Sequence, residues 1–201
     1  RPKKLNVPGE DSLRGKGVSY CSICDAPLFR AAEVAVVGGG NSGVQAVLDL
    51  LAVGARTVYL VTDMEITADP VLAEQIQNHP QVRIYPYSRV VAVHGEKLVT
   101  GITVRLEQNE TEEELAVEGL FIEIGLEPNS EIFPELWKNQ RGEIVVDCHC
   151  RTSSSGVFAA GDVTNLPEKQ IIIAAGEGAK AAITAWEYVT KVGALQASAA
   201  I

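Results

Sequence analysis

Two cysteines spaced three residues apart are the first groups that could do chemistry. Cys21 and Cys24 stand in the run C-S-I-C-D, a spacing that lets two thiols meet in a tight turn as a reversible disulfide. In exchange with another disulfide, one thiolate attacks and the other resolves the mixed disulfide, and Asp25 is placed to carry protons to and from the sulfurs. We favour a redox-active pair, and the alternatives are a zinc half-site and an inert pair.

A glycine-rich turn with the pattern G-x-G-x-x-G begins at Gly38. In such a pattern Gly38 makes a tight turn, Gly40 lets the backbone approach a pyrophosphate, and Gly43 lets helix and strand pack closely. The N-terminus of the helix that follows the turn would offer free N–H groups and a partial positive charge to the phosphates. Because a strand precedes the turn and a helix and second strand follow it, dinucleotide binding is favoured over a plain tight turn.

The end of the second strand bears on which dinucleotide is bound. Asp63 could accept a hydrogen bond from a ribose hydroxyl, a contact that would repel the 2′-phosphate of NADP. No Lys or Arg lies between Arg56 and Arg83 to bind that phosphate. We therefore expect NAD(P)H as a cofactor, with NADH favoured over NADPH. The alternative is that Asp63 only begins a surface turn.

A Gly-Asp pair follows another apolar run nearer the C-terminus. Gly161 and Asp162 would lie at the carboxyl end of a strand, where open α/β sheets bind ligands, and Asp162 could hydrogen-bond a polyol hydroxyl. Lys169, Gln170 and Ile171 could present N–H groups to the pyrimidine edge of a flavin, where reduction places negative charge. A Gly-Asp pair after a strand can equally be a simple turn.

Apolar runs and their breaks predict the elements that position these residues. The run 33–37 is typical of a strand buried on both faces of a parallel sheet, and with the next helix and strand it forms a right-handed β-α-β unit. Asn41 or Ser42 would cap that helix, and residues 5–20 are expected to be loop. We expect strands at 33–37, 57–61, 82–85, 88–93, 99–106, 114–118, 120–124, 143–146 and 156–160, and helices at 43–53, 70–78 and 174–192. The fold class is therefore α/β: a Rossmann-like three-layer nucleotide-binding domain with an antiparallel ribbon, and a hinge at 125–129.

Composition and charge exclude several classes of protein. The 201 residues are 46% hydrophobic and 21% charged, which is ordinary globular composition. A net charge of −9 argues against binding to nucleic acid or to a membrane surface. With no apolar stretch of about 18 residues and no signal peptide at the start, the cytoplasm is the expected compartment. Cys148 and Cys150 are interpreted as incidental thiols at a strand end, and no metal site is expected.

Together the motifs resemble the low-molecular-weight thioredoxin reductase family of pyridine nucleotide-disulfide oxidoreductases, and they are also similar to the flavoprotein component of alkyl hydroperoxide reductase. The resemblance covers nearly the whole chain. It is carried by LNVPGE at 5–10, GVSYC at 17–21, CD at 24–25, GGGNS at 38–42, GEIVVD at 142–147, TS at 152–153, GVFAAGDVTN at 156–165, KQI at 169–171 and AAGEGAKAA at 174–182.

The resemblance implies an activity and roles for residues. Electrons would pass from NAD(P)H through FAD to the cysteine pair and then to a thioredoxin-like or peroxiredoxin-type dithiol protein. Cys24 would face the flavin, Cys21 would attack the partner's disulfide, and Asp25 would donate protons. The implied cofactor contacts lie at Gly38, Gly40, Asn41, Ser42 and Gly43 for the nucleotide, and at Gly161, Asp162, Lys169, Gln170 and Ile171 for FAD. A homodimer is also implied.

The resemblance further implies how the chain is divided. Family members begin with a separate G-x-G-x-x-G that holds the ADP half of FAD, and this chain has a single such pattern. We therefore expect residues 1–4 to be a remnant of the FAD-binding domain, 5–126 the NAD(P)H-binding domain with the redox pair, and 127–201 the C-terminal part of the FAD-binding α/β domain. Without the N-terminal lobe, the chain is expected to bind FAD weakly or not at all. Alternatives from other classes are a non-catalytic nucleotide-binding module and a zinc-stabilised structural protein.

Overall fold

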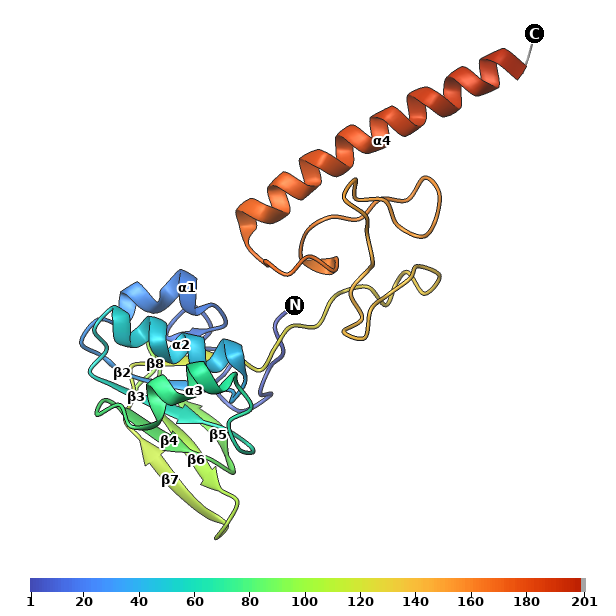
Figure 1. The fold of residues 1–201 in the computed structure, drawn as a ribbon. Coiled ribbons are helices and arrows are strands. Elements are labelled where there is room, and N and C mark those ends of the chain that lie inside the picture. Colours follow the sequence, from blue (N-terminus) through green and yellow to red (C-terminus); the bar gives the residue numbers. More distant parts are fainter. Residues whose placement is uncertain (200–201) are drawn as a thin grey trace. The chain divides into compact units, whose positions relative to one another are not determined.

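The computed structural model describes residues 1–199, and the side chains of residues 1–191 (Figure 1). The chain forms two compact units, of which unit 2 is Pro2–Leu126 and unit 1 is Arg1 with Glu127–Ile201. No helix among the described residues is both long and apolar enough to cross a membrane. The functional assignment of the two units stays a prediction.

Unit 2 is built around a parallel sheet of five strands in the order β1-β8-β2-β3-β4. Along β2, Ala35 pairs with Tyr59 on one side and with Leu120 on the other, so the strand before the glycine turn lies in the middle of the sheet. The strands are β1 (Val18–Ser19), β2 (Glu33–Val37), β3 (Thr57–Val61), β4 (Val82–Tyr85) and β8 (Gly119–Ile122).

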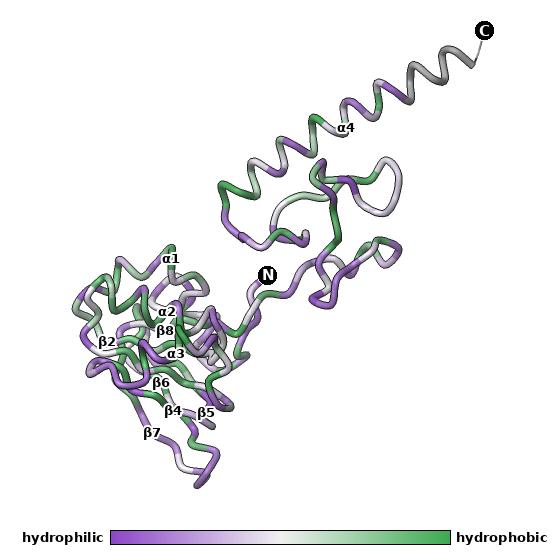
Figure 2. Tube along the Cα trace, in the orientation of Figure 1, coloured by the Kyte–Doolittle hydropathy of each residue, from purple (hydrophilic) through white to green (hydrophobic). Residues whose placement is uncertain are grey.

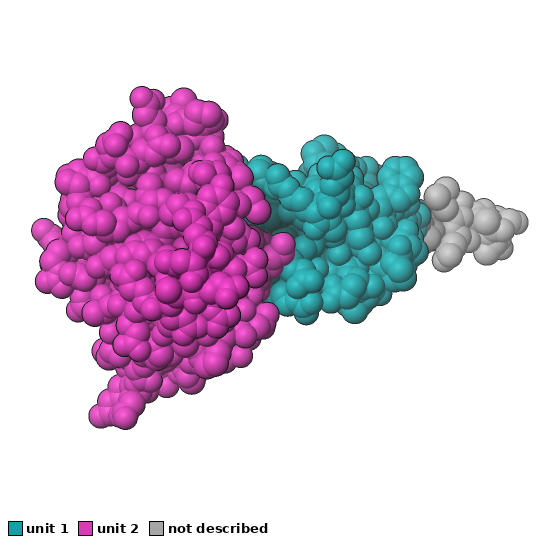
Figure 3. All heavy atoms as spheres, turned by 90° about the horizontal axis from the view of Figure 1, so that it is seen from below, with its two compact units in different colours: residues 1, 127–201 teal, residues 2–126 magenta. Residues whose placement is uncertain are grey.

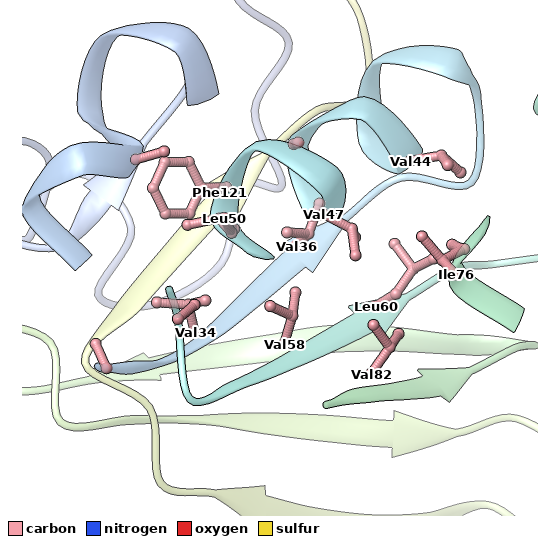
Figure 4. Close-up of a cluster of buried hydrophobic side chains, with 14 of the residues drawn as sticks. Val34, Val36, Val44, Val47, Leu50, Val58, Leu60, Ile76, Val82 and Phe121 are labelled. Atoms are coloured by element: carbon pink, nitrogen blue, oxygen red, sulfur yellow. The ribbon is translucent and has the colours of Figure 1, made fainter. Parts of the chain in front are cut away.

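Helices cover one face of this sheet, and alternation along the strands explains why. Val34 and Val36 are fully buried against α2 and its neighbours (Figure 4), because every second side chain of a strand points to the same face. Each fully buried Val or Leu contributes about 1.5–3 kcal/mol through the hydrophobic effect. The helical elements are α1 (Ser22–Asp25), the 3₁₀ turn η1 (Ala26–Phe29), α2 (Asn41–Ala52) and α3 (Pro70–Gln77).

An antiparallel ribbon covers the opposite face, which makes unit 2 a three-layer α/β structure (Figure 1). Ala35 and Val37, the alternate residues of β2, pack with Ile102 and Val104 of the ribbon. The ribbon has the order β5-β6-β7, with β5 at Ser88–His94, β6 at Gly101–Leu106 and β7 at Thr111–Leu115. The predicted fold class is confirmed: this is a Rossmann-like sheet with an antiparallel ribbon.

Several element bounds differ from the sequence prediction in unit 2. The residues predicted to be loop at 5–20 include the short strand β1. The last ribbon strand is Thr111–Leu115 rather than 114–118, because Thr111 pairs with Leu106 across a short turn. Four of its five residues are exposed, so no apolar alternation marks it, and Figure 2 shows its hydrophilic character. An edge strand with charged side chains is a common way to prevent edge-to-edge pairing.

The predicted cap of α2 is wrong. The helix begins at Asn41, and its N-cap is Gly40, which has an extended backbone and no side chain to donate or accept. Asn41 Oδ1 instead accepts the N–H of Asp69 over 2.7 Å. The capping role predicted for Asn41 or Ser42 is therefore absent, since both residues already lie inside the helix.

Unit 1 (Figure 3) contains the long helix α4 (Ile171–Ala199) and the 3₁₀ turn η2 (Gly161–Val163). The strands predicted at 143–146 and 156–160 are not formed. Ile144 and Phe158 make only isolated bridges, to Lys138, Thr164 and Arg151, because no described segment of the unit pairs along their length. The helix begins at Ile171, three residues before the predicted start. The buried apolar side chains of the described part are few, namely Leu136, Ile144 and Cys150.

Candidate functional site

The two cysteines of the C-x-x-C run form a disulfide at the start of α1. Cys21 is the N-cap of that helix with an extended backbone, and its Sγ accepts the N–H of Cys24 over 3.2 Å. Cys21 is half-buried and Cys24 is exposed. A disulfide with one accessible sulfur can undergo exchange with an incoming thiolate.

Asp25 closes the same turn and is held beside the disulfide by Ser19. The hydroxyl of Ser19 donates to Asp25 Oδ2 over 2.6 Å, and its oxygen accepts the N–H of Cys21 over 3.1 Å. The half-buried carboxyl therefore lies in one hydrogen-bonded group with the backbone of Cys21. This places a proton-carrying group in the same turn as the two cysteines, where it could assist thiol exchange.

The three motif glycines of the turn after β2, Gly38, Gly40 and Gly43, differ in how closely other atoms approach them. Gly38 has φ +132°, and a Cβ there would lie 2.4 Å from the carbonyl oxygen of Glu123. A Cβ on Gly43 would lie 1.8 Å from the carbonyl oxygen of Gly38, whereas a Cβ on Gly40 would meet nothing within 4 Å. Gly38 and Gly43 are thus needed for packing, while the backbone at Gly40 is open to an approaching ligand.

The segment after β3 folds against this turn. Thr67 and Ala68 donate their N–H groups to the carbonyl oxygen of Gly39 over 2.8 and 3.1 Å. Asp63 is exposed at the start of the segment, and Glu65 accepts a hydrogen bond from the Tyr87 hydroxyl over 3.0 Å. This strand end therefore carries two acidic side chains, Asp63 and Glu65.

In unit 1, the residues predicted to contact a flavin lie around the start of α4. Gly161 has φ +77°, and a Cβ there would lie 3.3 Å from the Cβ of Ala174 in the first turn of the helix. Asp162 is exposed, and the carbonyl oxygen of Gln170 accepts the N–H of Ala174 over 2.9 Å. Ile171 is 89% exposed.

Lys169, another of these residues, uses its amine within the unit. The amine forms an ion pair with Glu143 over 3.1 Å and donates to the carbonyl oxygen of Thr164 over 2.5 Å. Burial opposes the ionisation of Glu143, but hydrogen bonds from Asn139 and Lys169 outweigh it, so the pKa of Glu143 lies below its ordinary value. Two of the three N–H groups of the amine are therefore used within the unit.

The cysteine pair and the glycine turn both lie in the part of the chain that matches a known protein family. The family model described as "Pyridine nucleotide-disulphide oxidoreductase" matches residues 1–186. The chain belongs to this family. The resemblance inferred from the motifs is therefore confirmed.

The similar proteins are of two kinds: F subunits of alkyl hydroperoxide reductase and thioredoxin reductases. The F subunit of alkyl hydroperoxide reductase in Pseudomonas putida is 44% identical over 197 residues, which cover 96% of this chain and 38% of the relative. The protein of the same name in Escherichia coli is 42% identical and is covered to 37%. The crystal structure of thioredoxin reductase from Streptococcus pyogenes matches with a TM-score of 0.87 at 31% identity, covering 95% of this chain and 63% of that one. The chain thus spans well under half the length of the curated relatives it matches.

The glycine turn of this oxidoreductase chain fits a dinucleotide. The open backbone at Gly40 and the first turn of α2, which follows it directly, can hold a pyrophosphate. Ser42 is exposed in that turn, whereas the side-chain oxygen of Asn41 is already used by Asp69. Asn41 therefore keeps its backbone N–H and its side-chain NH2 group as donors for a ligand.

Glu123 is the functional candidate that sequence reasoning missed. Its Oε1 accepts the N–H of Ser22, between the two cysteines, over 3.2 Å, and its carbonyl oxygen lies against Gly38. It therefore connects the disulfide turn with the glycine turn. Burial raises the pKa of Glu123 to about 7, with the nearby charge of Asp49 adding to the effect and the Ser22 N–H opposing it. The sequence did contain a signal for Glu123: it is an acid directly after a buried strand, at the carboxyl end where α/β sheets bind ligands.

The second pair of cysteines behaves differently from the first. Cys148 is exposed and Cys150 is buried, and both are free thiols. The thiol of Cys150 donates to Glu177 Oε2 over 3.1 Å, and burial together with this contact raises its pKa to about 11. A thiol of that kind is a poor nucleophile at neutral pH. Among residues 1–191, no group of three or more His, Cys, Asp or Glu side chains is arranged to hold a metal.

Proposed function

We propose that this chain forms part of an FAD-dependent NAD(P)H:disulfide oxidoreductase that passes electrons through Cys21 and Cys24 to a dithiol protein. The observation that carries the proposal is the closed Cys21–Cys24 disulfide with Asp25 beside it, in the same compact unit as an open glycine turn. Bound FAD would supply the hydride-to-disulfide chemistry, because it accepts two electrons from a nicotinamide and passes them to sulfur.

The residues of this chain would then carry out the exchange with the acceptor. Reduction of the disulfide consumes two electrons and two protons and leaves two thiols, for which Asp25 supplies or receives a proton. The Cys21 thiolate attacks the partner's disulfide and forms a mixed disulfide, releasing one partner thiolate. Cys24 then attacks Cys21, which restores the internal disulfide and releases the reduced partner.

A peroxiredoxin-type acceptor is the favoured partner. Relatives that are named as the F subunit of alkyl hydroperoxide reductase share 41–44% of their residues with nearly the whole chain, whereas the thioredoxin reductase of Streptococcus pyogenes shares 31%. The TM-score of 0.87 to that structure makes a thioredoxin-like acceptor the second candidate. A homodimer in the cytoplasm, with NADH as the favoured nucleotide, completes the proposal.

The test is a chimera that joins this chain to the region of the Pseudomonas putida relative that lies outside the match. We expect it to oxidise NADH in the presence of a peroxiredoxin-type disulfide protein. The Cys24→Ser variant should keep reduction of the flavin by NADH but lose turnover, and it should accumulate a mixed disulfide between Cys21 and the acceptor. The matched control is Cys148→Ser, which should leave turnover unchanged.

Two results would count against the proposal. Turnover of the disulfide protein by the Cys24→Ser variant would remove the cysteine pair from the electron path. Tight NADH binding without any disulfide reduction by the unmodified chimera would instead favour a non-catalytic nucleotide-binding module.

A further inference from the structure

Both the backbone and the side chain of Glu123 form hydrogen bonds that hold this residue in place. It directly follows β8, and its N–H donates to the carbonyl oxygen of Val37 in β2 over 2.8 Å. Its carboxyl is half-buried and accepts the N–H of Ser22 over 3.2 Å. The carboxyl therefore holds a fixed position beneath the first turn of α1.

This position brings the carboxyl close to the disulfide. Ser22 N is bonded to the carbonyl carbon of Cys21, so Glu123 Oε1 lies within about 8 Å of Cys21 Sγ by covalent geometry alone. At that separation two charges in partly buried surroundings interact measurably.

The other groups packed around Glu123 do not neutralise it. From α2, Asp49 reaches the same turn, and its Oδ2 accepts the Ser22 hydroxyl over 2.9 Å. On α1 the charged group is Asp25, which is held by Ser19. From β2 and the glycine turn, the backbone of Val37 and of Gly38 contacts Glu123. The charged side chains among these contacts are all acidic.

We propose that Glu123 is a positioning residue of the reduced dithiol, which fixes the first turn of α1 through Ser22 and, when ionised, keeps the neighbouring thiols protonated. A negative charge near a thiol disfavours the thiolate, and the thiolate is the nucleophile in exchange. Burial raises the pKa of Glu123 to about 7, so its charge appears between about pH 6 and pH 8. Glu123 would thereby oppose the rise in thiolate that higher pH brings.

The inference deepens the proposed function and rests on it only for the catalytic use of the dithiol. Its test therefore uses the 201-residue chain without flavin, nucleotide or partner protein. If the thiols respond as described but the chimera shows no reductase activity, the proposed function fails while this inference stands.

The experiment measures alkylation of the reduced chain. The disulfide is reduced with a phosphine, and the rate of reaction of Cys21 and Cys24 with iodoacetamide is followed from about pH 6 to about pH 9 by peptide mass spectrometry. In Glu123→Gln, we expect the rate at pH 8 to rise about 3- to 10-fold, with little change at pH 6, because the charge is lost but the amide oxygen still accepts the Ser22 N–H. The rate profile should also become steeper between these two pH values.

Glu118→Gln is the matched control. Glu118 precedes β8 as Glu123 follows it, and its Oε2 also accepts a backbone N–H, that of Glu33, over 3.1 Å. This control should leave both thiol rates unchanged. Unchanged hydrogen-exchange protection of the β2 and β8 peptides shows that each variant keeps the fold of unit 2.

A second variant separates charge from hydrogen bonding. Glu123→Asp keeps a carboxylate, so its alkylation rate at pH 8 should stay within about twofold of the unmodified chain. A rate as high as that of Glu123→Gln would overturn the role of the charge. An unchanged rate at pH 8 in Glu123→Gln, or an equal rise in Glu118→Gln, would overturn the inference as a whole.

Discussion

Substituting Glu123 by Gln should change how the stability of unit 2 depends on pH. The pKa of Glu123 is about 7 in the folded chain against an ordinary value of 4.5, so the folded state binds more protons than the unfolded state between these values. The free energy of unfolding contributed by this group is therefore fully present below about pH 4.5 and is lost as the pH rises to about 7. Glutamine has no charge to bury and should not show this loss.

The magnitude follows from the size of the pKa difference. Each unit of difference corresponds to about 1.4 kcal/mol, so a rise from 4.5 to about 7 sets an upper value of about 3 kcal/mol. Solvent still reaches the half-buried carboxyl and screens its charge, so we expect a change of about 2 kcal/mol in the free energy of unfolding. Near pH 4.5 and below, the protonated acid and the amide are both neutral acceptors for Ser22, so the two proteins should have similar stability.

Urea unfolding from about pH 4 to about pH 8 measures the effect. Hydrogen exchange is measured at each urea concentration. The peptides of β2 and β3 report the unfolding of unit 2. With a urea dependence of about 2 kcal/mol per molar, Glu123→Gln should raise the unfolding midpoint by about 1 M at pH 8. Both tryptophans, Trp137 and Trp186, lie in unit 1, so tryptophan fluorescence follows the unfolding of that unit separately. Parallel pH profiles for the two proteins in unit 2 would refute the reasoning.

Three further substitutions test the nucleotide site. Gly40→Ala should lower the unfolding free energy by at most about 1 kcal/mol, because Ala is a poorer N-cap than Gly, but it should weaken NADH binding at least tenfold in calorimetry. Gly43→Ala, whose methyl group would lie 1.8 Å from the carbonyl oxygen of Gly38, should lose about 2 kcal/mol or more. Equal loss of stability in both would contradict the assigned packing. Asp63→Arg should shift binding about tenfold towards NADPH, and an unchanged NADH-to-NADPH ratio would remove Asp63 from the ribose contact.

The local sequence was enough to predict most of unit 2. The runs at 33–37, 57–61 and 82–85 match β2, β3 and β4 residue for residue, because short apolar runs bounded by turn residues have few other ways to bury their side chains. Strand β7 was misplaced because Glu112–Glu114 carry charges on both faces of an exposed edge, which leaves no alternation to read.

Unit 1 shows where local pattern fails. The apolar residues 144–146 and 157–160 have the composition of strands, yet they make only isolated bridges. A strand is stabilised by a ladder with a neighbour, and whether a neighbour exists is a property of the assembled structure. The helix from Ile171 was predicted because its signal is local, although its start was placed three residues late.

The sequence by itself determined the chemistry that is available: a cysteine pair at redox spacing, an adjacent acid, and glycines where a dinucleotide needs close approach. These follow from residue type and short spacing, which are read without a fold. Only the tertiary structure decided that Glu123 belongs with them, because Ser22 lies 101 positions away in the chain and becomes a neighbour through the pairing of β8 with β1 and β2. Burial, and the pKa shift it causes, exists only once those distant segments are packed together.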